Sequence, residues 1–178
     1  MLKMKSELRK KILEKRRGLS QKESGERSEK IIEKLKETKE FEEANTILFY
    51  VSTDNEVCTH DLIRECLQNG KTIAVPYVAN EEIMISKINS FKDLRKGAYG
   101  VLEPTWIIPI LRSDLDLAVV PGIAFDKKKN RVGYGLGYYD IFLKGLKCPK
   151  IGLAFDFQIV DKIDTEKHDV KLDKVLTD

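Results

Sequence analysis

The segment from Arg131 to Asp140, Arg-Val-Gly-Tyr-Gly-Leu-Gly-Tyr-Tyr-Asp, contains the residue types best suited to binding a charged ligand. Its alternate glycines Gly133, Gly135 and Gly137 allow backbone conformations in which successive N–H groups point at one anion. An expected helix follows, and its positive end would favour phosphate. The spacing is neither the dinucleotide GxGxxG nor a Walker A loop. It predicts a phosphate-binding loop, with a plain structural turn as the alternative.

Charged residues flank these glycines. Arg131 could add a bidentate, permanently charged contact to phosphate. Asp140 stands at the opening of the expected helix, where it would either cap the helix or bind Mg²⁺ beside the phosphates. Together with the glycines, these two residues favour nucleotide binding over a structural turn.

A second set of cations lies in the first segment of the chain. Lys5 and Arg9 are four residues apart and share one face of an expected helix, and Arg16 follows seven residues later on the same stripe. A solvated helix face is the alternative. If this helix closes over the glycine loop, Lys5 and Arg9 become ligands of a triphosphate.

Two acidic positions complete the candidate site. Glu56 follows an expected buried strand, and the carboxyl ends of strands in α/β sheets commonly form ligand sites. Its carboxylate could accept hydrogen bonds from a pterin-like ring, whereas the alternative is an exposed loop acid. Asp169 is a possible second metal ligand, and its neighbour His168 is interpreted as structural.

The hydrophobic pattern predicts the elements that position these residues. Met4, Leu8 and Ile12 recur every four residues and predict a helix over 3–17. Ser20 with Glu23 forms a capping-box signature for a second helix reaching about residue 39. Further helices are expected over 59–68 and 138–146, and strands over 46–51, 72–77, 83–88, 115–120 and 150–155. This alternation predicts an α/β fold, a three-layer sandwich around a mostly parallel, mixed sheet with two N-terminal helices.

Length and composition limit the class of protein. The 178 residues fit a single domain over 1–178, and the longest apolar stretches are far shorter than the ~18 residues of a membrane span. No signal-peptide pattern is present, so we expect a cytoplasmic protein. Cys58, Cys66 and Cys148 show no CxxC spacing, which argues against zinc and disulfides.

The charge balance does not require a nucleic-acid partner. The net charge is +3, although residues 1–40 carry 14 Lys/Arg against 8 Asp/Glu. The excess positive charge therefore lies in the N-terminal segment. A non-enzymatic nucleic-acid binder nevertheless stays open as one alternative, and a sugar-phosphate isomerase-like, phosphate-binding enzyme stays open as another.

Several of these motifs together resemble the 5-formyltetrahydrofolate cyclo-ligase family, also called methenyltetrahydrofolate synthetase. The resemblance covers nearly the whole chain. It is carried by Lys5-Ser-Glu-Leu-Arg9, Glu56, Gly100-Val-Leu-Glu-Pro104, the block from Pro121 to Asp140, and His168-Asp169-Val170.

This resemblance implies residue roles. ATP would be bound by Lys5, Arg9, Arg131, Val132, Gly133, Tyr134, Gly135, Leu136, Gly137, Tyr138 and Tyr139. The folate would contact Val51, Glu56, Tyr134, Gly135, Leu136, Gly137 and Tyr138, and Asp140 and Asp169 match the magnesium ligands. No residue is assigned as nucleophile or as general acid or base. In some relatives the residues at positions 134 and 136 are basic, so this loop offers fewer cations.

The resemblance also implies the reaction. An ATP- and Mg²⁺-dependent enzyme would convert 5-formyltetrahydrofolate, with or without a polyglutamate tail, to 5,10-methenyltetrahydrofolate through a phosphorylated formyl group, releasing ADP and phosphate. We expect it to act as a cytoplasmic monomer without nucleic-acid or membrane partners.

Overall fold

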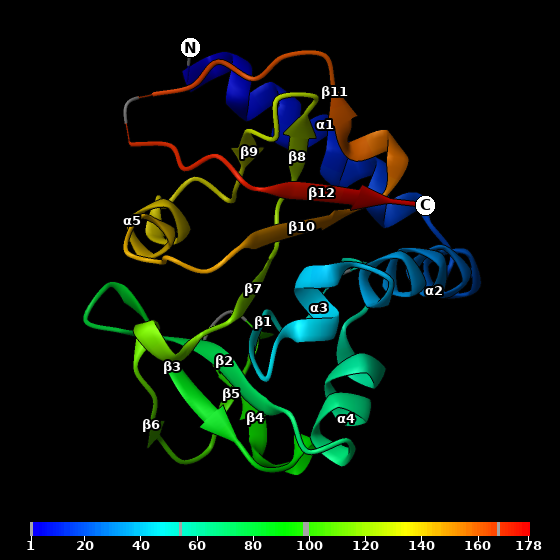
Figure 1. Ribbon diagram of the computed structural model, residues 1–178. Coiled ribbons are helices and arrows are strands. Elements are labelled where there is room, and N and C mark those ends of the chain that lie inside the picture. The colour runs from blue at the N-terminus through cyan, green and yellow to red at the C-terminus, as the bar shows by residue number, and fades with distance from the viewer. Residues whose placement is uncertain (1, 54, 98–99, 167) are drawn as a thin grey trace.

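A seven-stranded sheet forms the centre of the computed structural model, which describes residues 2–53, 55–97, 100–166 and 168–178 (Figure 1). The strand order is β12-β10-β7-β1-β2-β3-β6. The bounds are β1 Thr46–Phe49, β2 Thr72–Ala79, β3 Glu82–Ile88, β6 Ile108–Pro109, β7 Leu117–Val120, β10 Lys150–Ala154 and β12 Lys174–Thr177. Neighbours from β12 to β2 pair in parallel, whereas β3 is antiparallel to both β2 and β6. The predicted mixed, mostly parallel sheet is confirmed.

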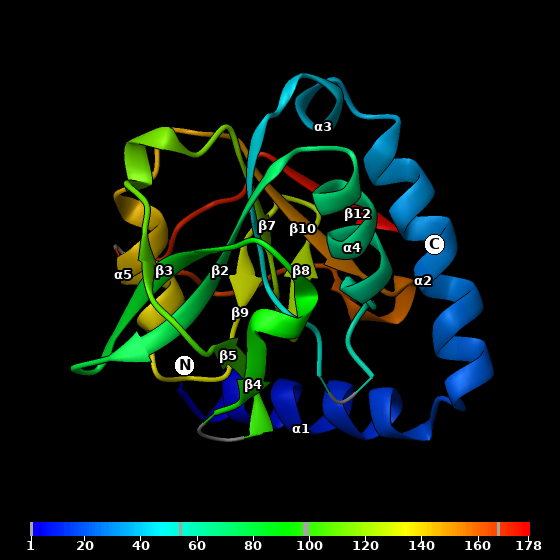
Figure 2. The same cartoon turned by 90° about the horizontal axis from the view of Figure 1, so that it is seen from below.

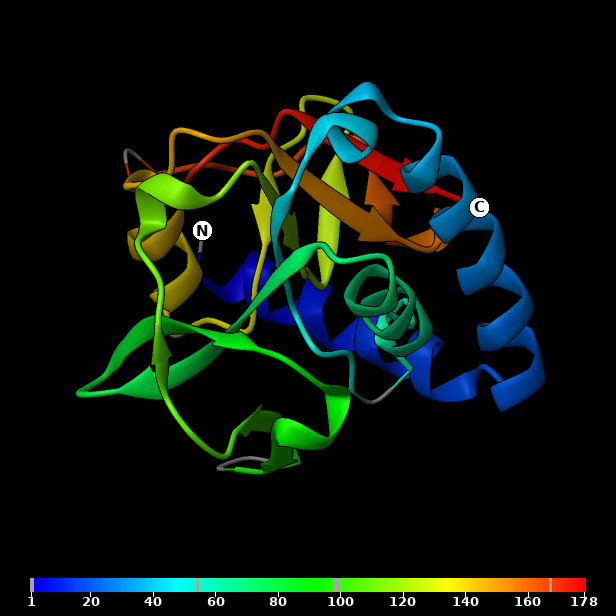
Figure 3. The same ribbon diagram turned by 60° about the horizontal axis from the view of Figure 1, so that its bottom comes forward.

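Helices cover both faces of this sheet. They are α2 Gln21–Lys36, α3 Lys39–Glu43, α4 His60–Gln68 and α5 Tyr138–Lys144, whereas α1 Leu2–Gly18 lies apart from the large sheet. Apolar side chains of α2, α3 and α4 pack on one face, where they share a hydrophobic core with β1, β2 and β7. Phe142 and Leu143 of α5 pack on the opposite face with Leu48 and Ala118. Figure 3 shows α2 and α4 on one side of the sheet and α5 on the other, which is the three-layer arrangement.

Helix α1 lies outside these layers and covers a second, smaller sheet. This sheet has the order β11-β8-β9, with bounds Ile159–Val160, Ala124–Asp126 and Arg131–Val132. Ile12 of α1 is buried against Ile123, Ala124, Val132 and Ile163. Figure 2 shows α1 running beneath β8 and β9. The small sheet therefore places the first helix close to the segment that begins at Arg131.

The remaining elements are short. A hairpin pairs β4 Leu94–Lys96 with β5 Leu102–Pro104, and single 3₁₀ turns occupy Phe91–Asp93, Arg112–Asp114 and Asp156–Gln158. Among the described residues, no helix is long and apolar enough to cross a lipid bilayer. Cys58, Cys66 and Cys148 are all free thiols.

The capping box predicted for the second helix is confirmed, but the predicted end of that helix is wrong. Ser20 Oγ accepts the Glu23 N–H at 3.2 Å, and Glu23 Oε2 accepts the Ser20 N–H at 3.0 Å. The helix stops at Lys36 rather than near residue 39, because Thr38 leaves the helical conformation and caps α3 through the Phe41 N–H. Expected strands over 46–51, 115–120 and 150–155 are each shorter than predicted.

Candidate functional site

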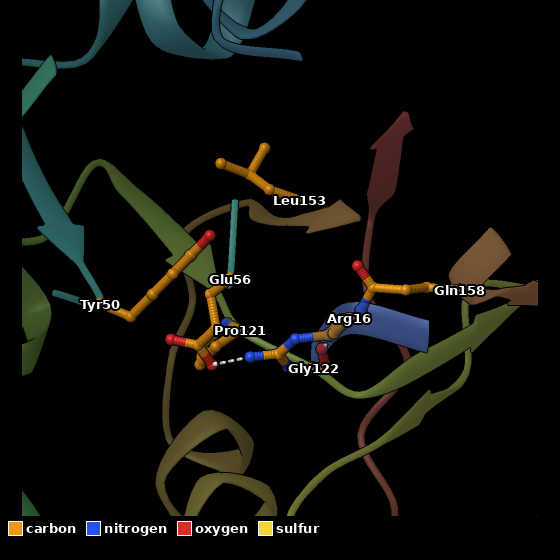
Figure 4. A pocket seen from close by; sticks show the side chains of 7 residues that line it. All are labelled: Arg16, Tyr50, Glu56, Pro121, Gly122, Leu153 and Gln158. Atoms are coloured by element: carbon orange, nitrogen blue, oxygen red, sulfur yellow. Dashed lines mark hydrogen bonds and ion pairs between the residues drawn. The ribbon is translucent and has the colours of Figure 1, made fainter. Parts of the chain in front are cut away.

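A small pocket opens where the chain changes direction across the sheet. From β1 the chain leads to β2 on one side, and from β7 it leads to β10 on the other, so β1 and β7 meet at a switch point of the topology. In the free protein its lining side chains leave no space for a water molecule. One residue comes from α1 and the others lie in or after β1, β7 and β10 (Figure 4): Arg16, Tyr50, Glu56, Pro121, Gly122, Leu153 and Gln158. The fold therefore places a concave site where α/β proteins bind ligands.

Glu56 lies in this pocket and is not an exposed loop acid. Its side chain is 10% exposed. One carboxylate oxygen, Oε2, accepts the Thr53 N–H at 2.9 Å, and the other accepts the hydroxyl of Tyr134 at 2.9 Å. Burial and the nearby Glu56 carboxylate raise the pKa of Tyr134 to about 12, so this hydroxyl stays protonated and donates.

Hydrogen bonds from a buried side chain hold the loop after β7 in place. Gln158 is buried, and its Nε2 donates to the carbonyl oxygens of Gly122 at 3.0 Å and Ile123 at 2.9 Å. Its Oε1 accepts the Phe155 N–H at 2.8 Å. A Cβ on Gly122 would lie 2.4 Å from the ring of Phe125, so any larger residue would displace this wall of the pocket.

The structure brings α1 against the glycine loop. Arg9 Nε donates to the carbonyl oxygen of Gly133 at 2.7 Å. Lys5 Nζ donates to Asp169 Oδ2 at 2.9 Å, and Arg16 Nη1 lies 3.4 Å from the hydroxyl of Tyr134. The three cations on one stripe of α1 therefore all reach this region, and none of them lies on a solvated face.

The conformation of the loop depends on its glycines. Gly135 has φ +106°, and Gly137, at the start of α5, has φ +72°, both in the region that L side chains rarely adopt. The helix that follows has only seven residues and no side-chain cap. We infer that side-chain cations must supply most of any attraction for phosphate at this loop.

Arg131 differs from the open phosphate ligand that the sequence predicted. Its side chain is 3% exposed, and Nη2 forms an ion pair with Asp140 Oδ1 at 3.1 Å. The guanidinium also lies 5.4 Å from the ring centroid of Tyr139. Its buried Nε has no hydrogen-bond partner among the residues that the structure describes. Arg131 therefore stabilises the glycine loop from its buried side, and its Nε–H is a donor that a ligand could use.

The two predicted metal ligands lie in neighbouring segments. Asp140 Oδ1 accepts the N–H of Val170 at 3.4 Å, directly after Asp169. Burial raises the pKa of Asp169, but the Glu166 N–H and the Lys5 ammonium outweigh this and hold that pKa below its ordinary value. Within the described ranges no group of three or more His, Cys, Asp or Glu could form a complete metal cage. Two carboxylates still fit Mg²⁺, which commonly takes one or two protein oxygens and completes its shell with water and phosphate.

The remaining predicted residues contribute in different ways. Val51 and Val132 are buried in hydrophobic clusters, so only their backbone could contact a ligand. Leu136 is 65% exposed and Tyr134 56% exposed. Tyr138 and Tyr139 are half-buried against the core beneath α5.

Of the seven residues that line the pocket, sequence reasoning assigned a binding role to Glu56 and none to the other six, three of which make contacts that shape the site. Arg16 had a recognisable signal, because it shares the helical stripe of Lys5 and Arg9. Tyr50 is buried and donates its hydroxyl to the carbonyl oxygen of Val57 at 2.8 Å. Gln158 lies in a segment without a motif, and only the folded chain shows its contacts.

Comparison with known proteins places this arrangement among one group of enzymes. A sequence model of the 5-formyltetrahydrofolate cyclo-ligase family matches residues 2–178. The chain is 33% identical to a 5-formyltetrahydrofolate cyclo-ligase of Mycoplasma pneumoniae, covering 98% of each protein. It is 31% identical to a probable 5-formyltetrahydrofolate cyclo-ligase of Caenorhabditis elegans, over 97% of this chain and 92% of that one.

A solved structure is also similar over almost the full length. The 5,10-methenyltetrahydrofolate synthetase of Aquifex aeolicus superimposes with a TM-score of 0.88 and 37% sequence identity, covering 98% of this chain and 89% of the other.

Proposed function

The chain belongs to the 5-formyltetrahydrofolate cyclo-ligase family, and from this membership we propose that it uses ATP and Mg²⁺ to convert 5-formyltetrahydrofolate to 5,10-methenyltetrahydrofolate. ADP and inorganic phosphate are the other products. The observation that carries this proposal is the juxtaposition of two subsites. The pocket that contains Glu56 adjoins a glycine loop whose Tyr134 reaches Glu56 directly, and three cations of α1 contact or flank the same region.

The proposed chemistry is the activation of a poor leaving group. The formyl oxygen on N5 attacks the γ-phosphorus of ATP, the bond to ADP breaks, and an imidate-type phosphate ester forms. N10 then attacks the activated carbon, loses its proton, and phosphate leaves with the former formyl oxygen. ATP is needed because the oxygen of an amide-like group leaves only after it has been phosphorylated.

The protein's contribution is positioning and charge stabilisation. Lys5 and Arg9 are the side chains available to the phosphates, and Arg131 supports the loop behind them. Glu56 would accept hydrogen bonds from the pterin ring. When bound, Mg²⁺ would offset charge on the transferring phosphoryl group, and Asp140 and Asp169 are the carboxylates that would bind it. No nucleophilic side chain is required.

The free pocket is smaller than the substrate. Its lining side chains leave no space for a water molecule, whereas ligand sites typically have roughly 300–1,000 Å³. We therefore propose that the ring of the folate lies over the mouth of the pocket, and that the rest of the substrate extends over the exposed part of the glycine loop. We further propose that the enzyme acts as a monomer in the cytoplasm.

Turnover with each reactant omitted in turn tests this function. With 5-formyltetrahydrofolate, ATP and Mg²⁺ all present, the near-ultraviolet absorbance of the methenyl product should grow, and omission of any one should abolish the growth. Product formation without ATP would contradict the proposal. Binding of nucleic acid without folate turnover, or isomerisation of a sugar phosphate, would support the alternatives instead.

A further inference from the structure

Arg16 is an unusual residue on α1, because its side chain is only 1% exposed whereas the next residue, Arg17, is exposed. Its Nη2 lies 3.8 Å from Glu56 Oε1, and its Nη1 lies 3.4 Å from the hydroxyl of Tyr134 (Figure 4 shows the ion pair with Glu56). Tyr134 in turn donates to the same oxygen of Glu56. One buried guanidinium thus contacts both a carboxylate of the pocket and a hydroxyl of the glycine loop.

The backbone sets the position of Arg16 relative to Glu56. Asn55 has φ +56°, and its side-chain amide donates to the carbonyl oxygens of Arg16 at 2.9 Å and Leu19 at 3.2 Å. The end of α1 is therefore attached to the loop that carries Glu56. The backbone on both sides of the ion pair is therefore held in place, which limits the conformations that the two side chains can adopt.

The position of the Arg16–Glu56 ion pair in the pocket connects it to ligand binding. Of the described residues that line the pocket, Arg16 is the one cation and Glu56 the one carboxylate. Burying a charge is costly unless it is paired, and a pair in a poorly hydrated site interacts more strongly than one in water. A pterin that covers the pocket would remove more water, which increases the dependence of Glu56 on its partner.

We propose that Arg16 is a positioning residue of the folate subsite. It fixes the Glu56 carboxylate and the Tyr134 hydroxyl where the ring of the substrate meets them, and it acts on folate binding rather than on the phosphates of ATP. This inference rests on the proposed function, and it adds a residue of the first helix to the folate side of the site.

Steady-state kinetics of Arg16→Lys test the proposal. We expect KM for 5-formyltetrahydrofolate to rise about tenfold while KM for ATP stays within about twofold of wild type, because lysine keeps the charge but not the planar fork. Arg17→Lys, the exposed neighbour on the same helix, is the matched control and should change neither constant. Arg16→Met should raise KM for the folate further than Arg16→Lys.

A second readout separates positioning from a structural role. The midpoint of thermal unfolding should rise on addition of 5-formyltetrahydrofolate in the wild type and much less in Arg16→Lys. The rise caused by ATP with Mg²⁺ should be equal in both. Equal increases in both Michaelis constants, accompanied by a lower midpoint without ligand, would show a purely structural role and overturn the proposal. So would an unchanged KM for the folate.

Tyr134→Phe provides a variant that leaves the side chains of Arg16 and Glu56 unchanged, since it removes only the hydroxyl that contacts them. We expect about a threefold rise in KM for the folate. In the double variant with Arg16→Lys the combined effect should be smaller than the product of the two, because both residues act on one carboxylate. Fully multiplicative effects would contradict the proposal. A wild-type protein that neither binds nor converts the folate would refute the proposed function itself, before any variant is compared.

Discussion

At the scale of residues, three ion pairs already link charged groups of the candidate site in the free protein. Lys5 pairs with Asp169 at 2.9 Å, Arg131 with Asp140 at 3.1 Å, and Arg16 with Glu56 at 3.8 Å. A ligand that uses these groups must exchange one partner for another. The pairs therefore hold each side chain in place before binding, at the expense of part of the electrostatic attraction for the ligand.

Asp140→Asn tests the magnesium assignment. The amide removes the negative charge that binds Mg²⁺ and pairs with Arg131, so we expect the Mg²⁺ concentration for half-maximal activity to rise at least about tenfold. The measurement is turnover across a series of Mg²⁺ concentrations. Asp161→Asn, in which the altered side chain is 95% exposed and pairs only with Lys127 among its described neighbours, should match the wild type. An unchanged Mg²⁺ dependence would remove Asp140 from the metal site.

The ion pair of Asp169 predicts a dependence of stability on pH. Its pKa in the folded protein is lowered below the value of about 3.9 expected when unfolded. The stabilisation is therefore fully present above that unfolded value, and it is lost as the pH falls through the lower, folded value.

Thermal unfolding of wild type and Asp169→Asn from pH 7 to pH 3 measures this effect. We expect the variant to melt at a lower temperature at pH 7, and the difference between the two midpoints to shrink once the pH falls below about 3.9. A difference that stays constant over this range would show that the charge of Asp169 does not stabilise the fold.

At the scale of elements, the glycine loop determines where α1 can contact the site. Gly135 has φ +106°, and a Cβ there would lie 3.4 Å from the Arg9 guanidinium carbon. Gly25, in the second turn of α2, has ordinary helical geometry and no atom within 4 Å of an added Cβ. The same substitution should consequently have opposite effects at the two positions.

Gly135→Ala should destabilise the protein by about 1–2 kcal/mol, because an L residue is strained in that conformation. It should also lower kcat/KM for ATP by displacing Arg9. Gly25→Ala should stabilise α2 by roughly 0.5–1 kcal/mol. Chemical denaturation measures both effects, and equal stabilities of the two variants would contradict the prediction.

Much of the element pattern could be predicted from the sequence, because the central elements depend on local signals. Continuous apolar runs identified β1, β2, β7 and β10, and the capping box located the start of α2. The small sheet could not be predicted in this way. Strands β9 and β11 have two residues each, and their conformation depends on pairing with β8 and on packing against α1.

The candidate site was predictable to a similar extent. The spacing of the glycines and of Lys5 and Arg9, and the position of Glu56 after a strand, could be recognised in the sequence. The structure brings these residues together. The burial of Arg16 and Arg131 could not be predicted, since charged residues are usually exposed and only tertiary contacts bury them. Gln158 lies 36 residues from its acceptor Gly122, and no local pattern relates the two.

At the scale of the whole molecule, the pairing of distant segments predicts one cooperative unit. The first helix contacts residues 133, 134 and 169, and α2 packs on the same sheet as the last strand. We expect one unfolding transition by calorimetry, with equal calorimetric and van't Hoff enthalpies. Light scattering should give a mass close to the 20.4 kDa of one chain. Separate melting of α1, or a dimer mass, would contradict these expectations.

The distance in sequence between Lys5 and Asp169, 164 residues, has a consequence for biosynthesis. On the ribosome the first helix emerges long before the segment that neutralises its lysine and the loop that receives its arginines. The site is thus completed only after the segment that carries Asp169 has emerged. Chains interrupted before Asp169 would lack one of the two carboxylates proposed for the metal, so such chains should not form the methenyl product from 5-formyltetrahydrofolate and ATP.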